Sequence, residues 1–429
     1  MAQTNIISRE RATYLAEEIT YGALPTGSFP NVATRVFPLG DGLILEGLAE
    51  EMLPVGDERV RRLDAIHPVH GLRIASKVGA LKMLLKTTKT GDQLDAGATL
   101  ASLTPRLVLR HALGSEYAAQ GDTISGSSSS AVLINVTDGT RFRKGTFIVV
   151  EVAGEMEFAK ITNIATHALT IAPALSAAPT AGTEVVRNLY NYCPAETHTS
   201  SLSVQQAFVN DPTAQVTAFG CYGDVSFDLP EYGKIPSMAL ALTASAFTGP
   251  ATASPPISVA SASDEMGPAF TFSPSVYLAT SVARATRLVC EGATIDYAND
   301  WQMVRDPGAT ASNGQLTTVA AVVSTGGRPV AVKASIKLRF DSDYPSDFTQ
   351  DTAYQMILVQ KVGTGLTASF WIWELPVARL VAQPKLTVIG DRLHMELMLE
   401  SIQDTNVTLA AETGTDLDFI LAPFRVAFG

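Results

Sequence analysis

The amino-acid sequence predicts a mainly β (α+β) fold, with two tandem domains of similar plan and a small all-β domain inserted into the first. Segments 219–247 and 370–402 share one plan: a strand-like arm, a middle marked by proline, and an apolar second arm. Five short β-like runs follow a Gly/Ser-rich stretch at 121–130. A stretch rich in Pro, Ser and Ala at 248–268 is expected to be a linker between the two halves.

The composition limits the class of protein. The 429 residues are 46% hydrophobic, which is ample for well-formed cores. No apolar run approaches the roughly 20 residues needed to cross a bilayer, so no membrane span is expected. The N-terminal segment carries charges where a secretion signal needs an apolar core, which favours a cytoplasmic compartment.

Charge and cysteine content exclude two kinds of site. The formal net charge of −11 opposes sequence-independent binding to nucleic acid, because phosphates repel an acidic surface. A surface that lets DNA pass without gripping it should nevertheless be neutral or acidic. The three cysteines, Cys193, Cys221 and Cys290, are widely spaced and odd in number. We therefore expect buried free thiols, with no disulfide framework and no Cys-rich metal site.

The N-terminal region divides into an arm and the start of the first domain. Residues 1–29 are predicted to form the arm, with a short helix around Arg9–Ile19. The first domain begins with segment 30–122, in which the apolar positions between residues 36 and 90 indicate several strands.

A helix and an insertion follow. Thr104 suits the N-cap, Pro105 the first helical position and Gly114 the helix stop. The five β-like runs then fall within 123–190, which we predict to be an inserted small β domain. Segment 191–247 completes the first domain, because the stretches on either side of the insertion are expected to share one sheet.

Segment 219–247 is predicted to be a long hairpin. Its first arm alternates apolar and polar residues, as does a strand with one buried and one wet face. The apolar residues are Val225, Phe227 and Leu229, and the polar ones are Asp224, Ser226 and Asp228. The pattern breaks at Pro230, Gly233 and Pro236, and the second arm carries Met238, Leu240 and Leu242.

The second domain is predicted over 269–429, with strands that resume after Ser281 and a helix through Asp347–Gln360. Segment 370–402 then repeats the hairpin plan. One face of its last arm is formed by Leu393, Met395, Leu397 and Leu399, and the other by Arg392, His394, Glu396 and Glu400. Each half thus has strands, a helix and a hairpin in the same order, which indicates a duplication.

The sequence contains no recognisable catalytic or metal-binding constellation. His67 and His70 are three residues apart in a strand or turn, with no third His or Cys nearby. The acidic run at 341–347 resembles a calcium loop, but Pro345 occupies a ligand position and the required Gly and Glu are missing. Phosphate-binding loops and nucleophile motifs do not occur. We therefore predict no enzyme, no cofactor and no metal ion.

Two clusters have competing interpretations. Trp371 and Trp373 suit a sugar-binding platform, but aromatic residues in an alternating hairpin are more often core or interface residues. The basic row of Lys333, Lys337 and Arg339 suits a phosphate. The favoured interpretation is that it pairs with acidic groups of a neighbouring subunit or faces solvent.

Several stretches together carry a family resemblance. They are SLTPRLVLRHALG at 102–114, VRRLDAIHPVHGLRIASKVGALKMLL at 60–85, GCYGDVSFDLPEYGKIPSMALALTASAF at 220–247, TRLVCEGATIDYANDWQMVRDPG at 286–308 and RLHMELMLES at 392–401. With them the chain resembles the tail-tube (major tail) proteins of long-tailed bacteriophages. The likeness covers most of 30–429 outside the insertion, as a diffuse pattern and not as one diagnostic motif.

The resemblance implies two tail-tube-like β-sandwich domains, each with a flanking helix and a long hairpin, whose sheets join between subunits to line an inner barrel. Stacked rings would form a conduit through which DNA and the tape-measure protein pass without specific binding. Two copies per chain imply a trimeric ring with pseudo-sixfold symmetry, and a hexamer is the alternative. Other tail proteins would be partners. The location would be the virion, after assembly in the host cytoplasm, and the insertion would project outward.

Within this picture the polar faces of the two hairpins are the candidates for the lumen. The candidate lumen-lining residues are Asp224, Ser226, Asp228, Arg392, His394 and Glu396. DNA carries about one charge per 1.7 Å of its axis, so an acidic or neutral wall leaves it mobile.

Three alternatives stay open at the level of sequence. A distal-tail or baseplate-hub protein of related fold would form one ring and no polymer. A carbohydrate-binding protein, using 123–190 and the Trp-bearing hairpin, would bind glycans as a monomer. An enzyme would need a site that the sequence does not reveal.

Overall fold

Strands dominate the structure, a computed structural model, and the prediction of a mainly β fold is confirmed. The structure describes residues 11–18, 34–36, 76–87, 104–195 except 127, 201–208, 211–248 except 232 and 245, 269–279, 286–298, 301–305, 319–324, 332–339, 352–389, 392–401 and 417–429. The predicted linker therefore lies almost wholly outside the described residues. The predicted division into domains stays a prediction.

Helix α2 (Thr104–Leu113) occupies the stretch predicted to be helical. It ends at Gly114, whose φ of +91° lies in the left-handed region that glycine adopts without steric cost. The helix buries Val108, Leu109 and Ala112 in the main hydrophobic core. It packs against β4 (Gly114–Tyr117), β11 (Tyr190–Pro194) and β13 (Asp211–Leu229).

The helix predicted around Arg9–Ile19 is wrong, because this segment forms strand β1 (Arg11–Glu18). Strand β1 pairs antiparallel along its whole length with β12 (Ser201–Phe208), and it also pairs with β2 (Thr34–Val36). The helix-favouring composition of the segment is a weak preference, and pairing on both edges overrides it.

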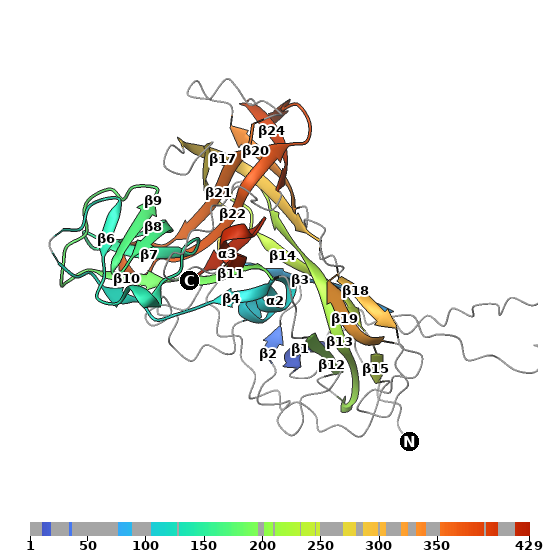
Figure 1. Cartoon of the computed structure of the whole chain (residues 1–429). Helices are drawn as coiled ribbons and strands as arrows, with labels where there is room; N and C mark the ends of the chain where they lie inside the picture. The colour runs from blue at the N-terminus through green and yellow to red at the C-terminus, as the bar shows by residue number, and fades with distance from the viewer. Residues whose placement is uncertain are drawn as a thin grey trace, which may run out of the picture.

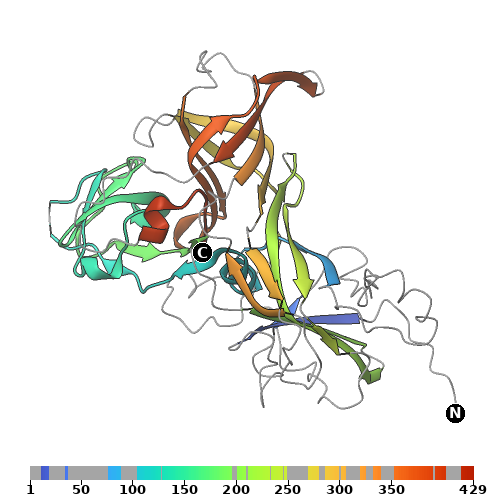
Figure 2. The same cartoon turned by 45° about the vertical axis from the view of Figure 1, so that its right-hand side comes forward.

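Six antiparallel strands form a continuous run that we call the hairpin sheet, and it joins the two halves of the chain (Figures 1 and 2). In spatial order the strands are β3 (Ser76–Leu84), β14 (Ser237–Ala244), β13, β17 (Thr286–Tyr297), β20 (Val332–Arg339) and β24 (Arg392–Ser401). The predicted first hairpin is present as β13 and β14.

Strand β13 takes part in two groups of strands. Its C-terminal part, from Tyr222 to Leu229, pairs with β14 and β17. Its N-terminal part pairs with β12 and with β15 (Ala246–Thr248). The φ of Gly220 between the two parts is +60°, a conformation that favours glycine where the strand changes partners.

The second hairpin differs from its prediction. Strand β22 (Ser369–Leu380) pairs mainly with β21 (Tyr354–Val362) and β25 (Arg425–Phe428), and it meets β24 only over Ala378–Leu380. The direct partner of β24 at the chain turn is the short strand β23 (Lys385–Ile389).

The predicted helix Asp347–Gln360 is also wrong where the structure describes it, because β21 begins at Tyr354. Strand β21 pairs with β22 on one edge and with β16 (Ser275–Ala279) on the other. Residues Met356 to Gln360 are all buried, so the strand shows no alternation of apolar and polar residues. An unbroken apolar run does not distinguish a strand from a helix by period. Residues 347–351 lie outside the described residues.

The remaining described strands form two smaller sheets. A two-stranded ribbon joins β18 (Trp301–Arg305) and β19 (Val319–Ser324). The other sheet holds all five predicted runs, in the order β5–β10–β7–β8–β9–β6. The six strands are β5 (Asp122–Thr123), β6 (Leu133–Asn135), β7 (Phe147–Val152), β8 (Glu155–Ala165), β9 (Ala168–Ala172) and β10 (Val185–Asn188). A bridge between Ile124 and Val136 joins its first and last strands, so we call this unit the inserted barrel.

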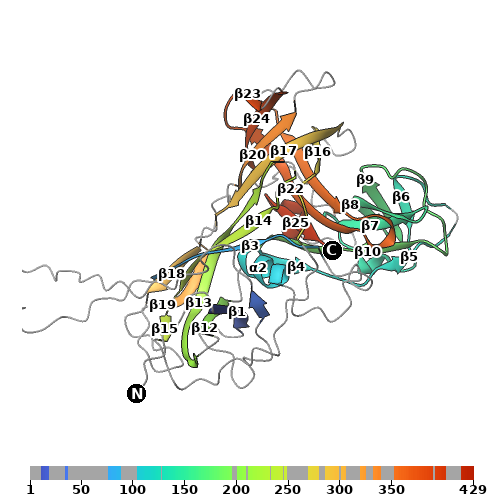
Figure 3. The same ribbon diagram turned by 180° about the vertical axis from the view of Figure 1, so that it is seen from behind.

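The inserted barrel has its own core and lies at the side of the molecule (Figures 1 and 3). The chain enters it after β4 and leaves it into β11, and these two strands pair directly, from Asn191 with Tyr117 to Pro194 with Gly114. Helix α3 (Leu417–Leu421) lies close by, with its Phe419 ring 6.3 Å from that of Tyr117. The barrel is thus anchored at adjacent points of entry and exit.

Candidate functional site

The two faces of the hairpin sheet have different chemistry. One face is apolar and belongs to the main core, with Val225 and Phe227 of β13 beside Leu240 of β14 and Ile295 of β17. Behind it the Phe227 ring meets Trp373 edge to face, with centroids 5.9 Å apart. The opposite face carries polar side chains that are exposed or half-buried. We call this second face the polar face.

The strand register aligns the polar face into rows that run across both halves of the chain. One row starts at Lys82 on β3 and passes through Ala239 to Ser226 on β13. From Ser226 it continues through Asp296 and Lys333 to Glu400 on β24. In this row Lys333 lies across from Asp296 on one side and from Glu400 on the other. Opposite charges directly across from each other on neighbouring strands stabilise the pairing of those strands.

A second row lies one pair further along the strands. Asp228 pairs with Thr294, which pairs with Ser335. The Lys82 ammonium lies 3.4 Å from the Asp228 carboxylate, and the side chains are 44% and 56% exposed. An exposed ion pair of this kind contributes little to stability. The Ser335 hydroxyl donates to the Glu396 carboxylate at 3.0 Å.

The polar face is most densely charged where β17, β20 and β24 meet. Arg339 donates to the Glu291 carboxylate from Nε at 2.9 Å and from Nη2 at 2.6 Å. His394 is buried, with Nε2 3.9 Å from Glu291 Oε1. Lys337 lies across from Glu396, and Glu396 lies across from Lys385 of β23. Positive and negative groups therefore alternate, and neither sign dominates this region.

The six candidate lumen-lining residues differ in how far their side chains are exposed on the polar face. Asp224 and Asp228 are exposed and Ser226 is half-buried, all three on β13. Glu396 is half-buried on the same face. The imidazole of His394 is buried, so it contributes little to the accessible surface.

Arg392 is the first residue of β24, and its side chain is outside the described residues. The register thus places Asp224, Ser226, Asp228 and Glu396 on one face of one sheet.

Further polar-face residues were not among the candidates. Thr294 and Asp296 of β17 lie between the two predicted hairpins and are exposed. The sequence indicates their exposure, because Ala293, Ile295 and Tyr297 alternate with polar neighbours. The partner strands of β17 depend on contacts between distant segments, and alternation alone does not define them.

The contacts decide between the competing interpretations of two clusters. Trp371 and Trp373 are fully buried and stack on each other with centroids 5.8 Å apart, so the favoured interpretation as core residues is confirmed and they form no sugar-binding platform. In the basic row, Arg339 binds Glu291 of the same chain, so it does not need a neighbouring subunit for an acidic partner. Lys333 is exposed, as expected for a residue that faces solvent, and Lys337 is half-buried. By register they lie across from Glu400 and Glu396.

Comparison with protein-family models finds no match, and comparison with curated proteins finds none either. Among the described residues, no three His, Cys, Asp or Glu side chains gather where they could hold a metal ion. The helices in the described ranges are too short or too polar to cross a bilayer. The two stretches that the sequence analysis weighed and rejected as metal sites, His67 with His70 and segment 341–347, lie outside the described residues.

Proposed function

We propose that this chain is a structural virion protein whose rings stack into the tail tube of a long-tailed bacteriophage, as a conduit for DNA ejection. The observation that carries the proposal is the polar face. One sheet gathers residues from both halves of the chain into a broad wet surface of mixed charge, backed throughout by an apolar core. Such a surface suits a passive wall, because it offers DNA no continuous band of cations to bind.

The two edges of the hairpin sheet support self-association, and β23 extends the sheet beyond β24 at one of them. In the described part of the chain, β3 pairs only with β14 and β23 pairs only with β24. Leu386 and Val388 of β23 are 55% and 71% exposed, although they stand across from Met395 and Leu393 on the core side of the sheet. An open strand edge with exposed apolar residues is a site for pairing with another chain. Closing the sheet through neighbouring subunits would cover both ends.

The ring is proposed to contain three chains, which rests on the duplication expected from the sequence, with a hexamer as the alternative. DNA and the tape-measure protein would pass through the lumen, and other tail proteins would bind the ends of the tube. The test is negative-stain microscopy across a concentration series, with the mass of the smallest ring measured in parallel. Hollow tubes of stacked three-chain rings are expected.

The same experiment separates the alternatives. Isolated rings that never stack would favour a distal-tail or baseplate-hub protein of related fold. A chain that stays monomeric at every concentration would contradict ring assembly altogether.

A further inference from the structure

The sheet formed by β21, β22 and β25 is buried on both faces. On one face Leu358 and Trp373 belong to the main core, which also contains Val426. On the other face a separate apolar cluster contains Ile357 and Ile372. Strands buried on both faces need a covering layer on each side, because an apolar face left in water is destabilising.

The covering layer on the second face is the inserted barrel. The cluster joins side chains from the outer surface of the barrel to side chains of the strands beneath it. The barrel supplies Phe147, Val149, Met156 and Ala172, and the strands supply Ile357, Val359, Phe370, Ile372 and Ala427. The Phe158 ring of β8 also lies 5.2 Å from Tyr277 of β16. These barrel residues are separate from the barrel's own core, where Ile148 and Val150 lie.

A buried charged centre fixes the orientation of this contact. The Glu374 carboxylate of β22 is fully buried, and it binds the Lys160 ammonium of the barrel and Arg425 of β25. The Arg425 Nη1 to Glu374 Oε2 distance is 2.6 Å. Buried charges must be paired, so a shift of the barrel along the sheet would leave Glu374 with one partner fewer.

A second polar contact holds the edge of the barrel. The Lys361 ammonium of β21 lies 2.8 Å from Glu155 Oε2 and donates to the Met156 carbonyl at 2.9 Å. The same carboxylate accepts from the Gly365 amide at 2.9 Å. The hydrogen bonds from Lys361 and Gly365 lower the pKa of Glu155.

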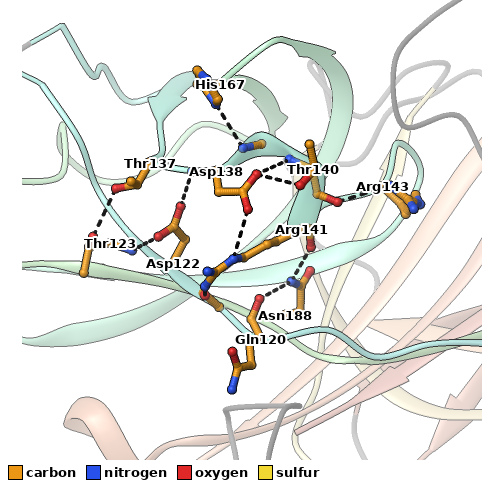
Figure 4. Close-up of polar contacts among 12 residues, drawn as sticks. Gln120, Asp122, Thr123, Thr137, Asp138, Thr140, Arg141, Arg143, His167 and Asn188 are labelled. Carbon is orange, nitrogen blue, oxygen red and sulfur yellow. Dashed lines mark hydrogen bonds and ion pairs between the residues drawn. The ribbon is translucent and has the colours of Figure 1, made fainter.

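The root of the barrel is also fixed, as Figure 4 shows. Asp138 accepts from the Thr140 amide at 3.0 Å and from Arg141 Nε at 3.3 Å. Asn188 donates to the carbonyls of Arg141, at 2.9 Å, and Gln120, at 3.2 Å. The segments that enter and leave the barrel are therefore tied to each other.

We propose that the inserted barrel is an internal clasp. It grows out of the first half of the chain, between β4 and β11, and covers strands of the second half. It completes the layer that would otherwise be missing there, where the expected flanking helix is instead β21, and it adds a second connection between the two halves beside the hairpin sheet. The expected outward-projecting module is thus also a required part of the body. This inference does not depend on the tail-tube function.

The test uses matched valine substitutions in the full chain. Val149 lies in the apolar contact, whereas Val132 is 48% exposed on the barrel. Hydrogen exchange is followed by mass spectrometry in peptides covering β21 and β25, more than 200 residues further along the chain. Val149→Asp should speed exchange there by about tenfold or more while β9 stays protected, and Val132→Asp should change neither.

The milder Val149→Ala variant guards against loss of folding in the Asp variant. It should speed exchange in the same β21 and β25 peptides by a smaller factor, again without effect on β9. Unchanged exchange in β21 and β25 in a folded Val149 variant would overturn the proposal. So would a chain that keeps its melting temperature when 122–188 is replaced by a short Gly/Ser loop.

Discussion

Arg425 and Glu374 form a buried ion pair, with Nη1 2.6 Å from Oε2, although they lie 51 positions apart in the sequence. Their side chains are 4% and 0% exposed. Water therefore contributes almost nothing to their solvation, and each depends on the other charge.

Glu374→Gln should lower the free energy of unfolding by about 3–5 kcal/mol, because it leaves two buried cations without their carboxylate. Urea denaturation followed by tryptophan fluorescence measures this loss. Glu396→Gln is the matched control, since Glu396 is half-buried on the polar face and accepts from a neutral hydroxyl. A loss no greater than that of the control would show that the buried pair is not a stabilising contact.

The same carboxylate makes stability depend on pH. Burial alone would raise the pKa of Glu374, but the charges of Arg425 and Lys160 outweigh it and hold the pKa below its ordinary value. The stabilisation is therefore present above the unfolded-state pKa of about 4.3 and is lost as the pH falls through the lower folded-state value. As the pH is lowered below about 4, the urea concentration at the unfolding midpoint should fall in the parent protein. It should fall less steeply in Glu374→Gln. Equal slopes for the two proteins would contradict this assignment.

The cysteine thiols should be unreactive in the folded chain. Cys193, Cys221 and Cys290 are free and buried, as the sequence predicted. Burial raises the pKa of Cys221 well above its usual value and that of Cys290 to about 12, so little thiolate forms. A thiol reagent at pH 8 should label no cysteine in native buffer and three in denaturant. Rapid labelling of native protein would disagree with these burials.

Gly223→Ala should disturb the first hairpin. A Cβ at this position would lie 2.0 Å from the Ala241 carbonyl oxygen, closer than any real contact. Relief requires movement of the β14 backbone, so we expect a loss of about 1–3 kcal/mol and weaker ring assembly. Ser226→Ala, three residues further along β13, is the control and should retain the parent melting temperature within a few degrees.

The charge of the polar face can be tested through DNA binding. Asp224 and Asp228 are both exposed, so Asp224→Lys with Asp228→Lys should create a basic strip without a change in the core. The parent protein should not retain duplex DNA in a filter assay at physiological salt. The double variant should bind, with an affinity that falls steeply as salt rises. Binding by the parent protein at the same salt concentration would contradict a passive wall.

The sequence predicted correctly those elements that are marked by capping residues, by turn residues or by one apolar and one polar face. Helix α2 carries a cap, a proline at its start and a glycine at its end, and β13 has one wet and one dry face. The barrel strands are short and bounded by turn residues. Each of these features depends only on residues close together in the chain, so it can be predicted from the sequence.

The failures have two physical causes, burial of a strand on both faces and pairing between distant segments of the chain. Strand β21 and the FWIW run of β22 lie between two apolar layers, so neither shows a period. Strand β1 is paired on both edges by segments far away in the sequence. Lys160 and Glu374 are in contact although they lie 214 positions apart, and the residues around each of them give no indication of this pairing. The polar face was predicted in part for the same reason, because β17 joins it only through long-range pairing.

The divided pairing of β13 has a mechanical consequence. One half of this 19-residue strand is hydrogen-bonded to β14 and β17, and the other half to β12 and β15. A tensile load applied along the strand would act on all of these hydrogen bonds at once, in shear, and would not break them one after another. The strand would then carry tension between the two groups of strands. At Gly220, where its partners change, the backbone amide is held by the buried Glu18 carboxylate at 2.9 Å.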